Sequence, residues 1–262
     1  MAESAFQDFV VVVTGASTGL GRAIAVQTAA QGAKAVLVNY ARNAEEAQET
    51  VRQVQAQGAH CMAVQGDVAD DEACRRIAAA AEGFGRIDAL FNNAAVTTFV
   101  RHADLDAVSA EDFQRIYAVN VVGAFQMTRA CRALLEAAPQ PGAVVNTSSI
   151  ASVMAMGSSI PYAASKAALN NMTKALARAL APKIRVNAVL PGFIDTTWFD
   201  KALTPQQVAK QRENAAAAAP LKVASSADDI AASAIFLGGR ASRHVTGEIL
   251  IVDAGRHLGL NP

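Results

Sequence analysis

Seven short apolar runs recur along the chain, and turns and helical patterns separate them. The first run, Phe9-Val10-Val11-Val12-Val13, is almost entirely β-branched and unbroken, which is typical of a strand covered on both faces. The other six runs are similar in length and lie at residues 35–38, 61–65, 87–91, 143–146, 184–189 and 249–252. We therefore predict seven strands.

Helical patterns fill the intervals between these runs. They begin near Arg22, Asn43, residue 70, Ser109, Pro161 and Ser226. Strand and helix alternate without a linker or a repeat, and this order predicts an α/β fold with a doubly wound, mostly parallel seven-stranded sheet and helices on both faces. We expect one domain over residues 1–262.

A glycine-rich turn follows the first strand directly. Strand, glycine turn and helix N-terminus together form a phosphate site, because glycine lets the backbone approach the ligand and the free N–H groups face its oxygens. The pattern predicts a Rossmann-type NAD(P)-binding domain. The expected contacts in this turn are Gly15, Ser17, Thr18, Gly19, Leu20 and Gly21.

The second strand leads into Asn39-Tyr40-Ala41-Arg42, where the adenosine ribose lies in dinucleotide folds. An acidic residue there would bind a ribose 2′-hydroxyl and repel a 2′-phosphate. Asn39 removes that repulsion, and Arg42 is close enough to pair with a phosphate, although it could also be a solvated arginine. We therefore favour NADP(H) and keep NAD(H) as the alternative.

Two further strand ends face the expected path of the cofactor. Asp67-Val68 follows the third strand, and Asp67 could accept a hydrogen bond from an adenine amino group or cap the next helix. Asn92-Asn93-Ala94-Ala95 follows the fourth strand with amides and small side chains. We expect Asp67, Val68, Asn93, Ala94 and Ala95 to contact the cofactor.

Tyr162 and Lys166 lie four residues apart, so they share one face of a predicted helix. An ammonium beside a phenol favours the phenolate, and we expect the pKa of Tyr162 to fall from its ordinary value of about 10. Such a phenol can protonate a carbonyl oxygen or deprotonate an alcohol. Taken alone, a pair of this kind is more often plain surface or core.

Two other features need an explanation. Asn120 stands inside a helical pattern, where its side chain competes with the backbone for hydrogen bonds. The segment 193–219 has an irregular composition with Trp198 and Phe199 near its start, and it is predicted to be a helical lid over a pocket.

These motifs occur in the order and with the spacing of the short-chain dehydrogenase/reductase family, which the chain resembles nearly end to end. The matching positions are Thr14-Gly15-xxx-Gly19-x-Gly21, Asn92-Asn93-Ala94, Asn120, Ser149, Tyr162-xxx-Lys166 and Pro191-Gly192. The resemblance implies an NAD(P)(H)-dependent oxidoreductase that transfers hydride between nicotinamide C4 and a ketone or secondary alcohol.

The resemblance also implies roles for single residues. Tyr162 would be the general acid or base, and Lys166 would lower its pKa and bind the nicotinamide ribose. Ser149 would hold the substrate oxygen, and Asn120 would distort its helix so that a backbone carbonyl anchors a water. Further cofactor contacts would come from Tyr162, Lys166, Pro191, Gly192, Ile194 and Thr196.

Some positions depart from the commonest pattern of the family. Ala95 stands where many members have glycine, and Thr18 stands where NADP-preferring members often carry arginine. The NADP(H) expectation therefore depends on Asn39, Tyr40 and Arg42. The stretch from Asn39 to Arg42 is similar to that of 3-oxoacyl-carrier-protein reductases, which favours an NADPH-dependent carbonyl reductase. The alternatives are an NAD-dependent alcohol dehydrogenase of the same family and a non-catalytic cofactor-binding sensor.

The expected substrate pocket is mainly apolar, with a few hydroxyls, and favours medium-sized ketones or secondary alcohols. Its rim consists of Val96, Ser148, Ser149, Ser152, Met154, Trp198 and Phe199. In the family that the chain resembles, the helices that start after Ser109 and at Tyr162 form the main dimer contact. We therefore expect a homo-oligomer, either a dimer or a tetramer.

Composition restricts the remaining function classes. The formal net charge is zero and no basic stretch occurs, so nucleic acid and membrane surfaces are not expected partners. The N-terminus has no positive region of a secretory signal, and no apolar run reaches the roughly 20 residues of a membrane span, which favours the cytoplasm. The three cysteines are expected to be buried thiols, and the four histidines have no metal-ligand spacing, so no metal is expected.

Overall fold

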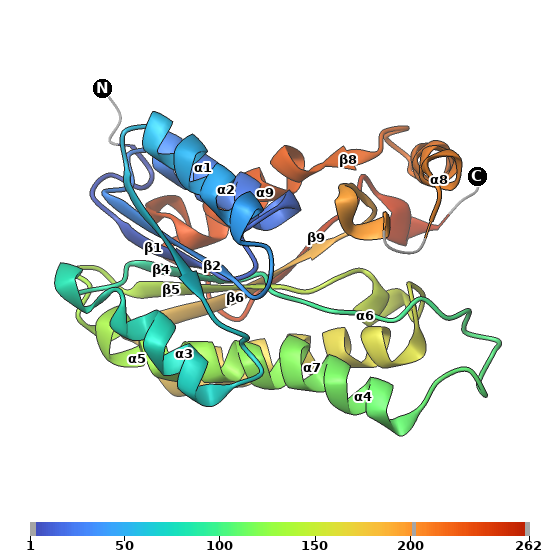
Figure 1. Cartoon of the computed structure of the whole chain (residues 1–262), viewed down its shortest axis with the longest axis horizontal. Helices are drawn as coiled ribbons and strands as arrows, with labels where there is room; N and C mark the ends of the chain where they lie inside the picture. The colour runs from blue at the N-terminus through green and yellow to red at the C-terminus, as the bar shows by residue number, and fades with distance from the viewer. Residues whose placement is uncertain (1–3, 201–202, 260–262) are drawn as a thin grey trace.

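Seven parallel strands form the central sheet of the computed structural model, which describes residues 4–200 and 203–259 (Figure 1). Their order across the sheet is β3-β2-β1-β4-β5-β6-β9. The strands are β1 (Val10–Val13), β2 (Ala35–Tyr40), β3 (His60–Gln65), β4 (Ala89–Asn92), β5 (Gly142–Thr147), β6 (Ile184–Pro191) and β9 (Ile249–Val252). The predicted seven-stranded, doubly wound sheet is confirmed, and every neighbouring pair in it is parallel.

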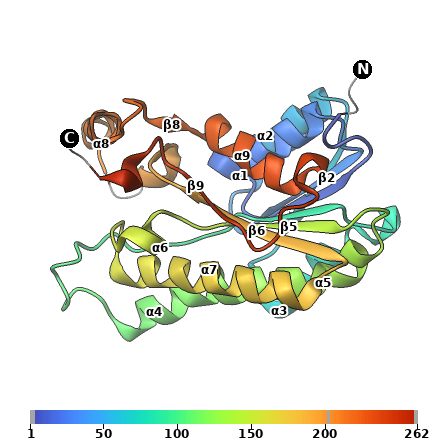
Figure 2. The ribbon, with the colours of Figure 1, turned by 180° about the vertical axis from the view of Figure 1, so that it is seen from behind.

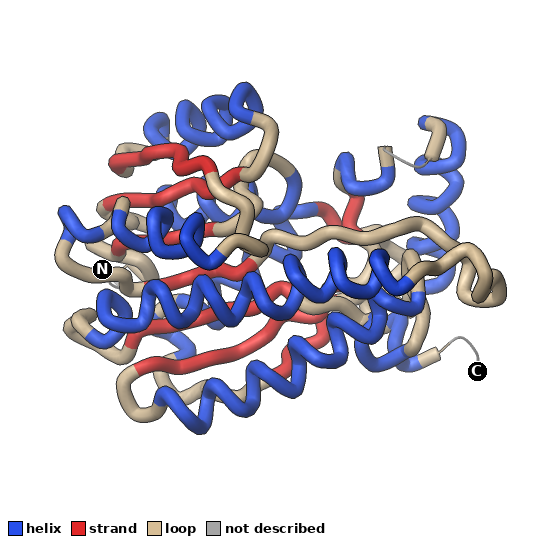
Figure 3. Tube along the Cα trace, turned by 60° about the horizontal axis from the view of Figure 1, so that its bottom comes forward, coloured by secondary structure: helices blue, strands red, loops and turns tan. Residues whose placement is uncertain are grey.

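Helices cover both faces of the sheet, as Figures 1 and 2 show from opposite sides. One face carries α1 (Gly19–Ala30), α2 (Ala44–Ala56) and α9 (Ala227–Gly238). The other carries α3 (Asp71–Ala79), α4 (Ala110–Tyr117), α5 (Ala124–Glu136) and α7 (Ile160–Leu180). In Figure 3 the helices of this second layer run across the front of the strands.

The core consists of two hydrophobic clusters, one on each face of the sheet. Val11 and Val13 belong to the cluster under α1, α2 and α9, whereas Val10 and Val12 belong to the cluster under α3, α5 and α7. All four valines of β1 are buried. Burial on both faces explains why this strand has no polar alternation.

The order in which the chain adds strands to the sheet reverses at β1. The chain first builds outward through β2 and β3, and then returns to place β4 on the other side of β1, with Val11 opposite Ala89. In open α/β sheets ligands bind outside the carboxyl ends of the strands at such a switch point. The loops that follow β1, β4 and β5 meet at this edge, so the fold determines where a site can form.

Several element boundaries differ from the sequence prediction. The strand predicted over 87–91 begins at Ala89, because Asp88 uses its carboxylate to accept a hydrogen bond from Val10 N at 2.8 Å. The helix predicted to begin near residue 70 covers Asp71–Ala79 and is followed by a separate 3₁₀ turn, Glu82–Phe84. The helix after Ser109 is interrupted by a π-helical turn, Ala118–Gly123.

The segment 193–219 contains more regular structure than predicted. It includes β7 (Ile194–Asp195), a 3₁₀ turn over Thr197–Phe199 and α8 (Pro205–Ala218). β7 pairs in parallel with β8 (Ser225–Ser226) in a small second sheet, whose strands are too short to give a periodic sequence pattern. Residues 201–202 of the predicted lid lie outside the described residues.

The thiols of Cys61, Cys74 and Cys131 are buried and unbridged, as predicted, and burial raises the pKa of each to about 12. Over residues 4–200 and 203–259, no helix has the length and apolar character that crossing a membrane requires. The same described residues contain no group of three or more His, Cys, Asp or Glu side chains that could hold a metal ion.

Candidate active site

The turn between β1 and α1 favours glycine at three positions, through positive φ angles or lack of room for a side chain. Gly15 and Gly19 have φ angles of +60° and +55°, a region that favours glycine. A Cβ on Gly21 would lie 2.5 Å from Gly15 O and 2.6 Å from Asn93 Nδ2. A glycine cradle at the N-terminus of a twelve-residue helix fits the pyrophosphate of a dinucleotide.

Side chains from the β4 loop and β1 hold this turn in place. Asn93 Nδ2 donates to Thr14 O at 3.2 Å and to Gly15 O at 3.1 Å. Thr14 Oγ1 accepts from Asn93 N and from Ala94 N, each at 3.0 Å. The Asn93 amide therefore supports the turn. The Leu20 side chain packs in the core cluster under α1.

Asn39 does not face the ribose position that the sequence suggested. It is buried inside β2, where its Nδ2 donates to Gly66 O at 3.0 Å and to Val64 O at 3.2 Å, and its Oδ1 accepts from Gly15 N. Its polar atoms are thus committed to the protein. Tyr40, the last residue of β2, is half-buried, and Ala41 and Arg42 are exposed just beyond it.

The structure separates the two roles considered for Asp67. Asp70 is the N-cap of α3, and its carboxylate accepts from Glu72 N, so the capping role proposed for Asp67 is wrong. Asp67 is exposed and its carboxylate accepts from Ala69 N at 3.0 Å. Val68 is buried, and its carbonyl accepts from Gln126 Nε2 at 2.8 Å.

Tyr162 and Lys166 lie in the first two turns of α7, where the cap residue Ser159 and Pro161 fix the start of the helix. Lys166 is only 1% exposed, and its Nζ donates to Thr147 O at 2.7 Å, beside the end of β5. The same Nζ lies 5.6 Å from the centroid of the Tyr162 ring. Ser149, two residues after β5, forms a side-chain hydrogen bond with Tyr162.

Burial reverses the expected direction of the tyrosine shift. Loss of solvation raises the pKa of Tyr162 to about 12, and the hydrogen bond with Ser149 only partly opposes it. Loss of solvation also lowers the pKa of Lys166 to about 7. The predicted fall in the Tyr162 pKa is therefore wrong for the protein alone, because burial penalises the charged form of both partners.

The buried ammonium should make stability depend on pH. The folded-state pKa of Lys166, about 7, lies below its ordinary value of 10.5, so the unfolded chain binds more protons between these values. The free energy of unfolding of the wild type should therefore rise, relative to Lys166→Met, as the pH increases from 7 to 9, by roughly 1 kcal/mol per pH unit. Urea denaturation at three pH values measures this difference.

Lys174→Met is the matched control, since Lys174 is exposed on the same helix. Its difference from the wild type should not change with pH. If the difference in the free energy of unfolding between the wild type and Lys166→Met were also independent of pH, the lowered pKa of Lys166 would be contradicted.

Asn120 lies within the π-helical turn and is 1% exposed. Its Oδ1 accepts from Val96 N at 2.8 Å, and its Nδ2 donates to Val96 O at 3.0 Å and to Ser165 Oγ at 3.0 Å. The helix distortion that the family resemblance implies is present at this residue. These bonds connect the loop after β4 to α7 between Tyr162 and Lys166.

A chain of hydrogen bonds supports Ser149 from behind. Ser149 Oγ accepts from Ala151 N at 3.1 Å, and Ser152 Oγ donates to Ser149 O at 2.5 Å. Asn170 Nδ2 in turn donates to Ser152 Oγ at 2.7 Å, a contact that the sequence pattern did not indicate. Ser148 is buried and donates to Lys166 O at 3.1 Å, so Ser148 and Ser152 both use their hydroxyls within the protein.

Ser152 also lines a cavity of about 270 Å³ beside α6 (Ala151–Met154) and α7. Its other lining residues are His102, Ala151, Ala155, Ile160, Ala163, Ala164 and Ala167. Neither Tyr162 nor Lys166 lines this cavity, although Ser152 connects it to Ser149 through a hydrogen bond.

The segment after β6 approaches both the glycine turn and Tyr162. Gly192 N donates to Val252 O and Pro191 O accepts from Ile150 N, which fix the start of this segment. A Cβ on Gly19 would lie 3.6 Å from the Thr196 side chain, so Thr196 lies over the turn. Ile194 packs against the core cluster under α1.

Aromatic rings line the side of the site next to this segment. The Trp198 ring lies 6.3 Å from that of Tyr162, and Phe199 stacks on Phe193 at 5.3 Å and lies 6.1 Å from Phe99. Sequence reasoning missed Phe99 and Phe193, because nothing in the sequence shows that these loops meet. Val96, Ala95 and Met154 are half-buried in the neighbouring loops.

The sequence is similar to that of known oxidoreductases along nearly its whole length. A family model described as enoyl-(acyl carrier protein) reductase matches residues 15–257. A Streptomyces violaceoruber protein assigned as ketoacyl reductase 2 of the granaticin polyketide synthase is 38% identical over 98% of this chain and 100% of its own length. L-rhamnose 1-dehydrogenase (NAD(P)(+)) of a Sphingomonas species is 36% identical over 95% of this chain and 96% of its own length.

Solved structures agree with the sequence matches. A crystal structure from Burkholderia xenovorans, assigned as a short-chain dehydrogenase/reductase, superposes with a TM-score of 0.87 at 35% identity, covering 96% of this chain and 98% of that one. The match extends along nearly the whole chain. It therefore includes the seven-stranded sheet, the glycine turn, Tyr162 and Lys166. The chain belongs to the short-chain dehydrogenase/reductase family, whose members are NAD(P)(H)-dependent oxidoreductases that act on CH–OH and C=O groups.

Proposed function

We propose that this protein is an NADPH-dependent carbonyl reductase in which Tyr162 is the general acid. The observation that carries the proposal is the meeting of Ser149, Tyr162 and Lys166 at the carboxyl end of β5. Thr196 and the aromatic rings after β6 lie next to this point, and the glycine turn lies beneath Thr196. A carbonyl between the turn and Tyr162 would be within reach of all three polar side chains.

Each side chain has a task that its chemistry allows. Ser149 donates a hydrogen bond to the substrate oxygen and keeps it beside the Tyr162 hydroxyl. Tyr162 then gives its proton to this oxygen in reduction, or takes a proton from it in oxidation. When it is protonated, Lys166 places a cation beneath the phenol and stabilises the phenolate that forms. The bound nicotinamide cofactor would donate or accept the hydride.

The proposed preference for NADP(H) depends on the end of β2. Positions 40–42 are Tyr, Ala and Arg, so none of them carries an acidic side chain. The exposed guanidinium of Arg42 could pair with a 2′-phosphate. Asn39 no longer supports this preference directly, because its side chain is buried. The related rhamnose dehydrogenase is named as using NAD(P)(+), so use of both cofactors is the nearest alternative.

The aromatic wall supports a substrate with an apolar part. Trp198, Phe199, Phe99 and Phe193 would contact this part of the substrate. We therefore propose a medium-sized ketone as substrate and a secondary alcohol as product, with a 3-oxoacyl group as one candidate. An NAD-dependent alcohol dehydrogenase with the same residues is the alternative function.

A panel of ketones, diketones, 3-oxoacyl thioesters and secondary alcohols tests the proposal, with nicotinamide absorbance as the readout and NADPH and NADH as parallel cofactors. Ketones with NADPH should give the highest kcat/KM. Higher kcat/KM for alcohols with NAD would favour the dehydrogenase alternative, and turnover of no compound, with the cofactor bound, would favour the sensor.

Assembly and location are proposals of the same kind. Phe113, Val122 and Phe125 are exposed along α4, the π-helical turn and α5, and Ile160 is exposed at the start of α7. These side chains would be covered in a dimer or tetramer built on the two helices. The cytoplasmic location stays a prediction from the sequence.

A further inference from the structure

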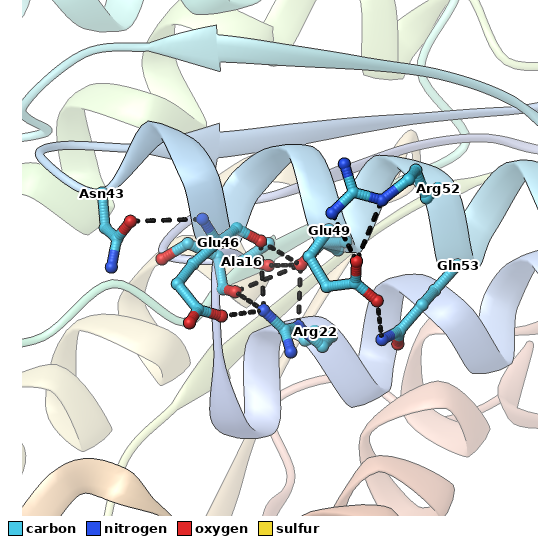
Figure 4. Close-up of polar contacts among 9 residues, drawn as sticks. Ala16, Arg22, Asn43, Glu46, Glu49, Arg52 and Gln53 are labelled. Atoms are coloured by element: carbon cyan, nitrogen blue, oxygen red, sulfur yellow. Dashed lines mark hydrogen bonds and ion pairs between the residues drawn. The ribbon is translucent and has the colours of Figure 1, made fainter.

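A charged cluster joins the glycine turn to α2 (Figure 4). Arg22, in the first turn of α1, is its centre. Its Nη2 donates to Ser17 O at 2.5 Å and to Glu46 O at 3.0 Å, and it pairs with the Glu46 carboxylate at 2.5 Å. Its Nε donates to Thr50 Oγ1 at 2.9 Å. One guanidinium therefore connects the turn to a carboxylate on α2.

Glu46 lies close in the sequence to the stretch where we expect the adenosine ribose. α2 begins directly after the Tyr40–Arg42 stretch, and its N-cap Asn43 accepts from Glu46 N at 3.1 Å. Through Arg22, the carboxylate is one side chain away from the Ser17 carbonyl. An unneutralised carboxylate at this place would repel a 2′-phosphate and would leave a 2′-hydroxyl unaffected.

We propose that the Arg22–Glu46 ion pair is a specificity determinant that allows the cofactor site to accept a 2′-phosphate, because Arg22 cancels the charge of Glu46. The inference rests on the proposed function for the location of the adenosine ribose. The new element is that the choice between NADPH and NADH depends on the net charge of the Arg22–Glu46 pair, although neither residue is among those expected to touch the ribose. The wild-type pair is neutral, and each single substitution gives it a net charge.

A purely structural role predicts something different. Arg22 and Thr50 also hold the turn, since Thr50 Oγ1 donates to Ala16 O at 3.0 Å. Loosening the turn would weaken NADPH and NADH to the same extent, because both carry the same pyrophosphate. Only the charge effect changes the ratio of the two dissociation constants.

The test is fluorescence titration of NADPH and NADH against the wild type, Arg22→Met, Glu46→Gln and the double variant. Arg22→Met leaves one negative charge and should shift the ratio toward NADH by about three- to fivefold, because Glu46 is partly screened by solvent. Glu46→Gln leaves one positive charge and should shift it toward NADPH by a similar factor. The double variant is neutral again, and its ratio should return to within about twofold of the wild type.

Arg52→Met is the matched control. Arg52 pairs with Glu49 one turn further along α2, and within the described part of the chain no bond connects this pair to the glycine turn, whereas Arg22 donates to Ser17 O. Arg52→Met changes the charge of the protein as Arg22→Met does, but the carboxylate that it leaves lies one turn further from the start of α2, so the ratio should change much less.

Three results would overturn the inference. One is equal weakening of both cofactors in Arg22→Met, and another is an unchanged ratio in Glu46→Gln, which keeps the test valid if Arg22→Met does not fold. The third is a double variant whose ratio stays with either single variant. A wild type that binds neither cofactor would refute the proposed function itself and is distinguished by that result.

Discussion

Tyr162→Phe should lower kcat by about a hundred- to ten-thousandfold, the usual contribution of a positioned general acid or base. The substitution removes only the hydroxyl, so the ring keeps its contact with Trp198 and its place above Lys166. The KM for the cofactor should stay near that of the wild type, because the loss concerns the reacting oxygen. Steady-state kinetics with the best substrate of the panel measure both values.

Tyr117→Phe is the control for this variant, as Tyr117 ends α4 and has no proposed chemical role. It should have kcat close to the wild type. If Tyr162→Phe also turned over at the wild-type rate, Tyr162 would not be the proton donor, and the proposed chemistry would have to be abandoned.

Gly21→Ala should abolish measurable cofactor binding and destabilise the protein. The added Cβ would meet Gly15 O at 2.5 Å, Asn93 Nδ2 at 2.6 Å and Ala16 Cα at 2.9 Å, and two of these atoms belong to the backbone of the turn. The turn must move to accept the methyl group, and overpacking of this kind costs about 1–3 kcal/mol. Thermal unfolding and fluorescence titration with NADPH measure the two effects.

Gly83→Ala provides the comparison, because a Cβ at Gly83 would have no atom within 4 Å. This variant should bind the cofactor and unfold as the wild type does. Wild-type affinity in Gly21→Ala would show that the turn tolerates a side chain and does not cradle the cofactor closely.

The strands could be predicted from the sequence because a buried strand consists mainly of apolar residues. β1 is apolar at every position, and the turn after it has glycine where the backbone has positive φ or no room for a side chain. The family motifs gave the order of the site residues, and α7 brings Tyr162 and Lys166 to one side because they are separated by about one helical turn.

The direction in which a side chain points was much harder to predict. Asn39 occupies the strand end that the pattern indicated, but strand alternation turns it into the protein toward Gly66. The predicted fall in the pKa of Tyr162 was wrong for a similar reason. The spacing of the two residues reveals a neighbouring charge, but it does not reveal how deeply both groups are buried. Phe99 and Asn170 were missed because their contacts join distant parts of the chain.

The return of the chain to β1 has a consequence for the growing polypeptide. β1 pairs with β2 after a short excursion, but its other edge is paired only by β4, with Val11 opposite Ala89. During synthesis this apolar edge stays open until about 78 more residues have been added. The emerging N-terminal part therefore exposes unpaired backbone groups of an entirely apolar strand, and ribosome-bound chains that end before β4 should depend on chaperones more than longer ones.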